Sequence, residues 1–190
     1  MLGFIESPYD ERDYEYSIED KTEELPKEYD YSEYCKLDIL DQGSDSTCVP
    51  HSIKTMLDTM SYDYKINIKE FYDRRPNKPQ EGMAIREALK IIKKDINDPF
   101  YQYFRLHSIL QIKYSLISNG PCIFALPVRS MNYEFWKGSE DLGGHAICCV
   151  GYNEFGFILQ NSWGNTFGEY GKCVLPYEDL NYIIEVWGII

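Results

Sequence analysis

The chain has 190 residues, a formal net charge of −12, and hydrophobic and charged fractions of 44% and 26%, as in an ordinary water-soluble protein. This length fits one domain, or two lobes around a cleft, with a sizeable buried core. No apolar run reaches the roughly 20 residues that a membrane-spanning helix needs, and no basic patch favours nucleic-acid binding. The first residues also lack the basic and then apolar pattern of a secretory signal. We therefore expect neither a membrane nor a nucleic acid as a partner.

Most of the negative charge lies near the N-terminus. Residues 6–33 contain twelve acidic and three basic side chains, a net charge of −9. Residues 1–24 show no apolar periodicity, and we interpret them as an acidic N-terminal arm in front of a domain of residues 25–190. The simplest interpretation of the arm is a solvated, extended segment. A second hypothesis is that the arm covers a functional cleft.

The first half of the domain shows helical patterns. Cys48 to Met60 is expected to form a helix, because Pro50 suits a first turn and Ile53, Met56 and Leu57 recur at helical spacing. Two further helices are expected over residues 83–94 and 108–118. The last of these has a serine at its start and Asn-Gly-Pro after its end.

The second half changes character. We expect strands over residues 122–128, 145–152, 156–160, 172–175 and 183–190, because apolar runs there are separated by Gly-rich or polar turns. Helices followed by strands indicate an α+β chain. Residues 25–118 would form a mainly helical lobe, and residues 119–190 a mainly β lobe.

The six cysteines form neither a CxxC pair nor a metal-ligand spacing. Cys148 and Cys149 are adjacent in an expected strand, so their side chains should point to opposite faces. With Cys48 set aside as a nucleophile, the remaining number is odd. This pattern favours reduced cysteines in the cytoplasm or another reducing compartment, with no metal site.

Three short segments carry the chemistry. They are Gln42-Gly43-Ser44-Asp45-Ser46-Thr47-Cys48, Gly143-Gly144-His145-Ala146 and Gln160-Asn161-Ser162-Trp163-Gly164. A thiol attacks as its thiolate, an imidazole can take its proton, and an amide can fix the imidazole tautomer. At a helix N-terminus we expect the pKa of the Cys48 thiol to be lowered. The other two histidines, His51 and His107, are expected to be structural.

These segments resemble those of the papain-like cysteine peptidases. In that family a Gln-Gly-Ser lies six residues before the nucleophile, as Gln42 does before Cys48. The histidine opens an apolar strand that ends in Gly-Tyr, as His145 does here. Asn-Ser-Trp-Gly follows, as it does from Asn161. Leu25-Pro26 is similar to the start of the mature family domain.

The resemblance implies a role for each matching residue. Cys48 would be the nucleophile, His145 the general base and acid, Asn161 its orienting partner, and Gln42 an oxyanion donor beside the Cys48 N–H. Trp163 would shield the hydrogen bond between His145 and Asn161 from water.

The resemblance also implies the substrate site and the overall shape. Gly82 would pair with the substrate backbone, and Gly144 would allow that backbone to approach. The side chain two residues before the scissile bond would enter a pocket of Met83, Ala125 and Ala146. The implied fold has a helical lobe and an antiparallel, barrel-like β lobe with the cleft between them.

Two positions depart from the family pattern. Asp45 stands where secreted members have a disulfide cysteine, and Val49 where an aromatic residue usually follows the nucleophile. The separation of Cys48 and His145 is also shorter than the roughly 130 residues of the family pattern. We interpret the shortening as trimmed surface loops, which stability tolerates well.

The resemblance implies a cysteine endopeptidase that acts on polypeptides through a thioester acyl-enzyme, with no cofactor. Two alternatives stay open: a catalytically silent protein that keeps the fold for binding or structure, and a related thiol hydrolase such as a deubiquitinase or a cell-wall peptide hydrolase. Compact, disulfide-poor members with short pro-regions occur in bacteria, phages and large viruses, so we expect such an origin.

Overall fold

The computed structural model describes residues 3–11, 13–18, 24–34, 38–61, 64–97 and 101–190. The helices are α1 (Cys48–Thr59), α2 (Ile68–Tyr72), α3 (Ile85–Ile96) and α4 (Ile109–Ser118), with 3-10 turns η1 (Tyr31–Glu33) and η2 (Tyr177–Tyr182). The strands are β1 (Phe4–Ile5), β2 (Tyr14–Glu15), β3 (Tyr29–Asp30), β4 (Met83–Ala84), β5 (Tyr103–Arg105), β6 (Cys122–Val128), β7 (Gly143–Tyr152), β8 (Gly156–Gln160), β9 (Lys172–Pro176) and β10 (Glu185–Ile189). None of the helices in the described ranges is long and apolar enough to cross a membrane.

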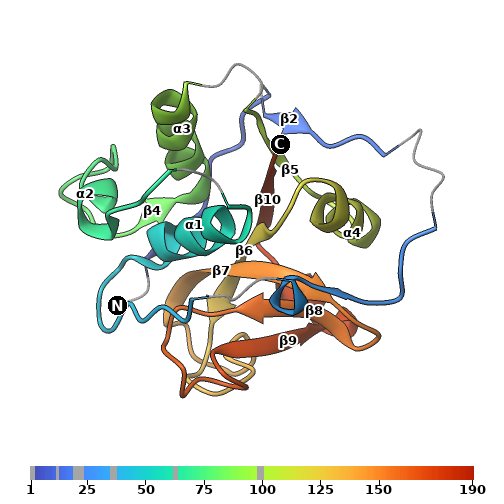
Figure 1. Cartoon of the computed structure of the whole chain (residues 1–190). Coiled ribbons are helices and arrows are strands. Elements are labelled where there is room, and N and C mark those ends of the chain that lie inside the picture. Colours follow the sequence, from blue (N-terminus) through green and yellow to red (C-terminus); the bar gives the residue numbers. More distant parts are fainter. Residues whose placement is uncertain (1–2, 12, 19–23, 35–37, 62–63, 98–100) are drawn as a thin grey trace.

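The strands form one open, branched sheet. Its main path runs β2-β5-β10-β6-β7-β1-β4, while β3 and β8 also pair with β7, and β9 pairs with β8. Figure 1 shows α1, α2 and α3 gathered on one side of β7, with β8 and β9 on the other. This arrangement confirms the expected α+β fold. Strands β6 and β7 form a long antiparallel pair, whose register runs from Cys122 opposite Cys149 to Val128 opposite Gly143.

Helices α1 and α4 lie where the sequence predicts them, whereas α3 is displaced and α2 was not predicted. The buried face of α1 contains Ile53, Met56 and Leu57, each without exposed surface, which confirms the helical spacing. Helix α4 begins after Ser108, whose Oγ accepts from the Gln111 N–H. Helix α3 begins two residues later than expected, because residues 83 and 84 are extended and pair with β1.

The core divides into two clusters on either side of β7. Cys148 belongs to the cluster under α1 and α3, and Cys149 belongs to the cluster that contains β8 and β9 residues. The expected opposite orientation of these two side chains is therefore confirmed. The five described cysteines are all free thiols and all buried; Cys35 lies outside the described residues.

The described part of the N-terminal arm is built into the sheet. Strand β1 lies between β7 and β4, and β2 pairs with β5 at the far edge. Phe4 is 9% exposed, and Tyr16 is 6% exposed and stacks on Phe104 with ring centroids 4.7 Å apart. The interpretation of the arm as a solvated segment is therefore wrong for these residues. Phe4 and Tyr16 are apolar side chains within this acidic stretch, and they pack into the core although the net charge of the stretch suggests exposure to solvent.

Candidate active site

Cys48 is the first residue of α1, and its side chain is completely buried. Burial raises the pKa of the Cys48 thiol above its ordinary value, although backbone hydrogen bonds from Ala146, Gly3, Val49 and Cys48 itself favour the thiolate. The expected lowering of this pKa is absent because the helix N-terminus is here sealed from water.

His145 lies near the start of β7, and its imidazole is enclosed by aromatic rings. Its Nε2 atom lies 2.8 Å from the Asn161 Oδ1 atom, and its ring centroid lies 4.7 Å from that of Trp163 and 5.5 Å from that of Phe135. Burial lowers the pKa of His145 to about 4, with the Asn161 hydrogen bond acting in the opposite direction. Its Nδ1 atom has no hydrogen-bond partner among the described residues. The nitrogen that would exchange a proton is thus left unpaired.

Gln42 connects the segment before α1 to the loop that follows β8. Its backbone N–H donates to the Ser162 carbonyl over 2.8 Å, and its Oε1 atom accepts from the Ser162 hydroxyl over 2.8 Å. The side-chain Nε2 donates to the Asp45 carbonyl. A primary amide has a second N–H, so one donor stays available for an oxyanion.

The four expected catalytic residues are linked by a short chain of contacts. Ala146, next to His145, reaches the Cys48 sulfur through its N–H. Asn161 bonds His145 and also accepts from the Ser162 N–H, while Ser162 bonds Gln42. Residues far apart in the sequence therefore surround one point beside the start of α1.

Strand β1 lies between β7 and β4 at this point. Phe4 pairs with Met83 in a parallel ladder and with Gly144 in an antiparallel one, and the Met83 N–H donates to the Gly3 carbonyl over 2.7 Å. Gly3 presses on the loop before Cys48: a Cβ on Gly3 would lie 2.0 Å from the Ser46 carbonyl oxygen. Only glycine fits at this position.

Glycine is also required opposite Phe4. A Cβ on Gly144 would lie 2.4 Å from the Phe4 ring, so Gly144 lets strand β1 approach β7 closely. The sequence reasoning did not single out Gly3 or Phe4. Their signal is weak: a glycine and two apolar residues ahead of an acidic stretch.

The residues expected to bind substrate have mixed surroundings. Met83, Ala125 and Ala146 belong to one buried cluster, which also contains Phe4. Gly82 has a left-handed φ of 90°, but its N–H donates to the Tyr72 hydroxyl and its carbonyl accepts from the Asn77 side chain. Strand β1 therefore pairs with Met83–Ala84 and not with Gly82. Both backbone hydrogen-bonding groups of Gly82 are already bound to the nearby Tyr72 and Asn77 side chains.

His51 and a cavity beside it lie near the start of α1. His51 Nδ1 lies 2.7 Å from the Thr47 carbonyl oxygen, and burial lowers its pKa. A cavity of about 610 Å³ beside this histidine is also lined by Gln42, Thr47 and Glu81. Within the described ranges, no group of three or more His, Cys, Asp or Glu residues is arranged to hold a metal ion.

No protein-family model matches the chain. A curated relative, an uncharacterized peptidase C1-like protein of Acanthamoeba polyphaga mimivirus, is 34% identical over 95 residues. The match covers 42% of this chain and 30% of the viral protein.

Three solved structures share the fold. Xylellain, a cysteine protease from Xylella fastidiosa, superposes with a TM-score of 0.78 at 20% identity over 99% of this chain and 95% of its own. A procathepsin B from Trypanosoma congolense gives 0.71 at 17% identity over 94% and 81% of the two chains. A Carica candamarcensis cysteine protease, solved with the inhibitor E-64, gives 0.65 at 14% identity over 87% and 98%. The chain therefore has the papain-like fold, and its sequence match is to a C1-like peptidase.

Proposed function

We propose that this chain is a cysteine peptidase that hydrolyses peptide bonds in polypeptides. The observation that carries the proposal is a chain of contacts: the Ala146 N–H, next to His145, reaches the Cys48 sulfur, and His145 is linked through Asn161 and Ser162 to Gln42. This set contains a cysteine at a helix N-terminus, an imidazole with one nitrogen held by an amide, and a glutamine side chain whose Nε2 uses one N–H on the Asp45 carbonyl. The fold and the viral C1-like relative support the same activity.

The arrangement assigns each step to a group. Cys48 Sγ attacks the substrate carbonyl carbon, with its proton passing to His145 Nδ1. The Gln42 side-chain N–H and the Cys48 backbone N–H bind the oxyanion. His145 then protonates the departing amine, which leaves a thioester on Cys48. A water molecule, deprotonated by His145, hydrolyses that thioester.

In this proposal the structure represents a closed state, in which the N-terminal arm covers the site. Strand β1 fills the cleft and presents the Gly3 N–H to the sulfur, whereas the Gly3 carbonyl is turned toward the Met83 N–H. Attack needs a carbonyl carbon at the sulfur, so the arm occupies the cleft without being a substrate. Its removal would admit water, which relieves the burial that raises the pKa of Cys48 and lowers the pKa of His145.

Labelling by the epoxide inhibitor E-64 tests the proposal. We expect the full chain to acquire one adduct, on Cys48, over hours of incubation as the arm opens transiently, and the Cys48→Ala variant to acquire none. The same Cys48→Ala chain should keep its folded circular dichroism spectrum and lose cleavage of an unfolded protein substrate. An adduct on another cysteine, or undiminished cleavage by Cys48→Ala, would contradict the assignment.

A further inference from the structure

Ser7 follows β1 by two residues and joins the arm to three elements of the body. The residue is 3% exposed. Its hydroxyl donates to the Glu185 Oε1 atom over 2.9 Å and accepts from the Arg86 N–H over 3.3 Å. Its carbonyl accepts from the Arg105 Nη2 atom over 3.1 Å. These contacts fasten the arm to β10, α3 and β5, so the closed position of the arm depends on them.

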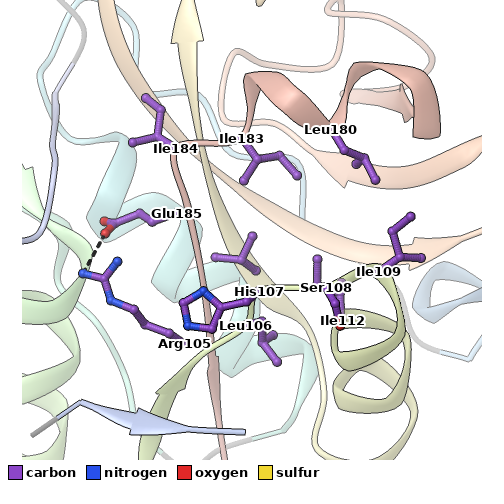
Figure 2. Close-up of a pocket in the computed structure, with 11 residues that line it drawn as sticks. Arg105, Leu106, His107, Ser108, Ile109, Ile112, Leu180, Ile183, Ile184 and Glu185 are labelled. Carbon is purple, nitrogen blue, oxygen red and sulfur yellow. Dashed lines mark ion pairs between the residues drawn. The ribbon is translucent and has the colours of Figure 1, made fainter. Parts of the chain in front are cut away.

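Glu185 uses the Ser7 hydroxyl as a donor. The Glu185 side chain is 1% exposed, and its other oxygen, Oε2, forms no well-aligned hydrogen bond within the described part of the chain. That oxygen lies 3.5 Å from the Arg105 Nη2 atom, in the ion pair that Figure 2 shows. A buried carboxylate that loses a donor is destabilised, and a second negative group beside it repels it. An anionic substituent on Ser7 would have both effects.

The surroundings of Ser7 also leave little room for a larger group. A nearby cavity of about 420 Å³ is lined by Arg105 and Glu185 but not by Ser7. A group added to the buried Ser7 oxygen would therefore overlap packed atoms, and overpacking of this kind is destabilising. This steric conflict does not depend on the ionisation of Glu185, whose pKa is raised by burial.

The sequence around Ser7 suits an enzyme that modifies serine. Ser7-Pro8 is the one dipeptide of the chain in which proline follows serine or threonine. Proline-directed protein kinases accept such a dipeptide within an extended segment, and a proline favours extended backbone in the residue before it. Glu6 and Pro8 are exposed, and Tyr9 is 84% exposed. Once Ser7 leaves its partners, the residues around it already face solvent.

Release of Ser7 would act on the site through β1. Strand β1 has only two residues, and the backbone of Gly3 just before it forms a hydrogen bond with the Cys48 sulfur. Farther along the arm, Asp13 forms an ion pair with Arg86 at 3.0 Å, and β2 pairs with β5. Residues 3–9 can therefore leave and return while the rest of the arm stays bound.

We propose that Ser7 is a phosphorylation site, and that a phosphoryl group there prevents β1 from returning to its place beside Cys48. The Ser7 oxygen attacks the γ-phosphorus of ATP held by a proline-directed serine kinase. A P–O ester bond forms, the bond from the γ-phosphorus to the bridging oxygen breaks, ADP leaves, and the hydroxyl proton passes to a base of the kinase. This inference names a regulation of the proposed peptidase and rests on that function for its effect on cleavage.

The first test treats the full chain with a MAP kinase and MgATP, in parallel with the Gly3→Ala and Ser7→Ala chains. Mass spectrometry of the separated peptides locates the phosphate. We expect it on Ser7 of the unsubstituted chain. The Gly3→Ala chain should acquire it faster, because its added Cβ disfavours the closed position, and the same peptide of Ser7→Ala should acquire none. Absence of phosphate on Ser7 in both the unsubstituted and the Gly3→Ala chain would overturn the inference.

The second test measures the rate at which iodoacetamide alkylates Cys48, with the buried Cys122 thiol as a reference for unfolding. Phosphorylation of Ser7, or Ser7→Glu, should raise this rate roughly tenfold or more, because a hydrogen bond to a charged group is worth about that ratio. Ser139→Glu adds a negative charge at an exposed serine between β6 and β7 and should leave the rate unchanged. A phosphorylated chain that reacts at the unphosphorylated rate would overturn the inference. Parallel acceleration at Cys122 would overturn it too, because the effect would then be unfolding.

Peptide cleavage separates this inference from the proposed function. A phosphorylated chain that exposes Cys48 but cleaves no peptide would refute the peptidase and leave the phosphorylation site intact. Cleavage at the same rate with and without phosphate on Ser7 would refute the regulation and leave the peptidase intact.

Discussion

Replacing Gly3 with alanine should open the cleft. The added Cβ would lie 2.0 Å from the Ser46 carbonyl oxygen and 2.3 Å from the carbonyl carbon, and both are backbone atoms that precede α1. Overpacking of this kind costs about 1–3 kcal/mol, which changes a closed-to-open equilibrium by roughly 5- to 150-fold. The cost falls on the closed state alone, because Gly3 has no such contact once β1 has left. Alkylation of Cys48 should accelerate by the same factor.

The assay is the rate of Cys48 alkylation by iodoacetamide, followed by mass spectrometry of the separated peptides. Cys122 provides an internal reference, because burial raises the pKa of its thiol to about 12 and it reacts only when the domain unfolds. Glu6→Ala, an exposed change in the same segment, should leave the Cys48 rate near that of the unmodified chain. A Gly3→Ala rate at or below that of the unmodified chain would refute the reasoning. Parallel acceleration at Cys122 would attribute the effect to unfolding.

Three other changes probe the site and the arm. Asn161→Ala removes the 2.8 Å contact with His145 Nε2 and should lower kcat by roughly 5- to 150-fold with little change in peptide affinity; an unchanged kcat would remove Asn161 from the mechanism. Because the folded-state pKa of His145 is about 4, against an ordinary value of 6.5, the unfolded chain binds a proton first. Stability present above pH 6.5 should therefore fall by up to about 3 kcal/mol as the pH approaches 4, and urea unfolding of His145→Ala should show less of this loss. Asp13→Asn leaves Arg86 and Arg105 without their shared carboxylate and should destabilise the fold by about 3 kcal/mol in the same unfolding assay; a change below 1 kcal/mol would show that the arm is not anchored there.

The elements with strong periodicity were predictable. Helix α1 and strands β6 and β8 occupy the residue ranges that the apolar spacing indicates, and Ser108 caps α4 as its sequence predicts. Each of these segments buries a continuous face, so the spacing of its apolar residues can be recognised within one short stretch of the sequence. Strands β1, β2 and β4 were missed because each has two residues and exists only through pairing with a distant segment.

The candidate site divides in the same way. The residue types and the order of Cys48, His145 and Asn161 could be interpreted from local motifs, because each role depends on the few residues around it. The state of the thiol could not. Its pKa depends on the complete burial of the thiol and on a backbone hydrogen bond from Gly3, which approaches from 45 residues earlier in the chain.

The double hydrogen bond between Gln42 and Ser162 limits how this molecule can admit a ligand. It fastens the strand-side loop to the entry of α1, one peptide unit from the amide that orients the imidazole. A hinge motion that separates the start of α1 from the loop after β8 would break both Gln42–Ser162 hydrogen bonds and displace Gln42 and Asn161 together. Such a motion is therefore an unfavourable way to expose the Cys48 sulfur. Withdrawal of strand β1 alone would leave both Gln42–Ser162 hydrogen bonds in place.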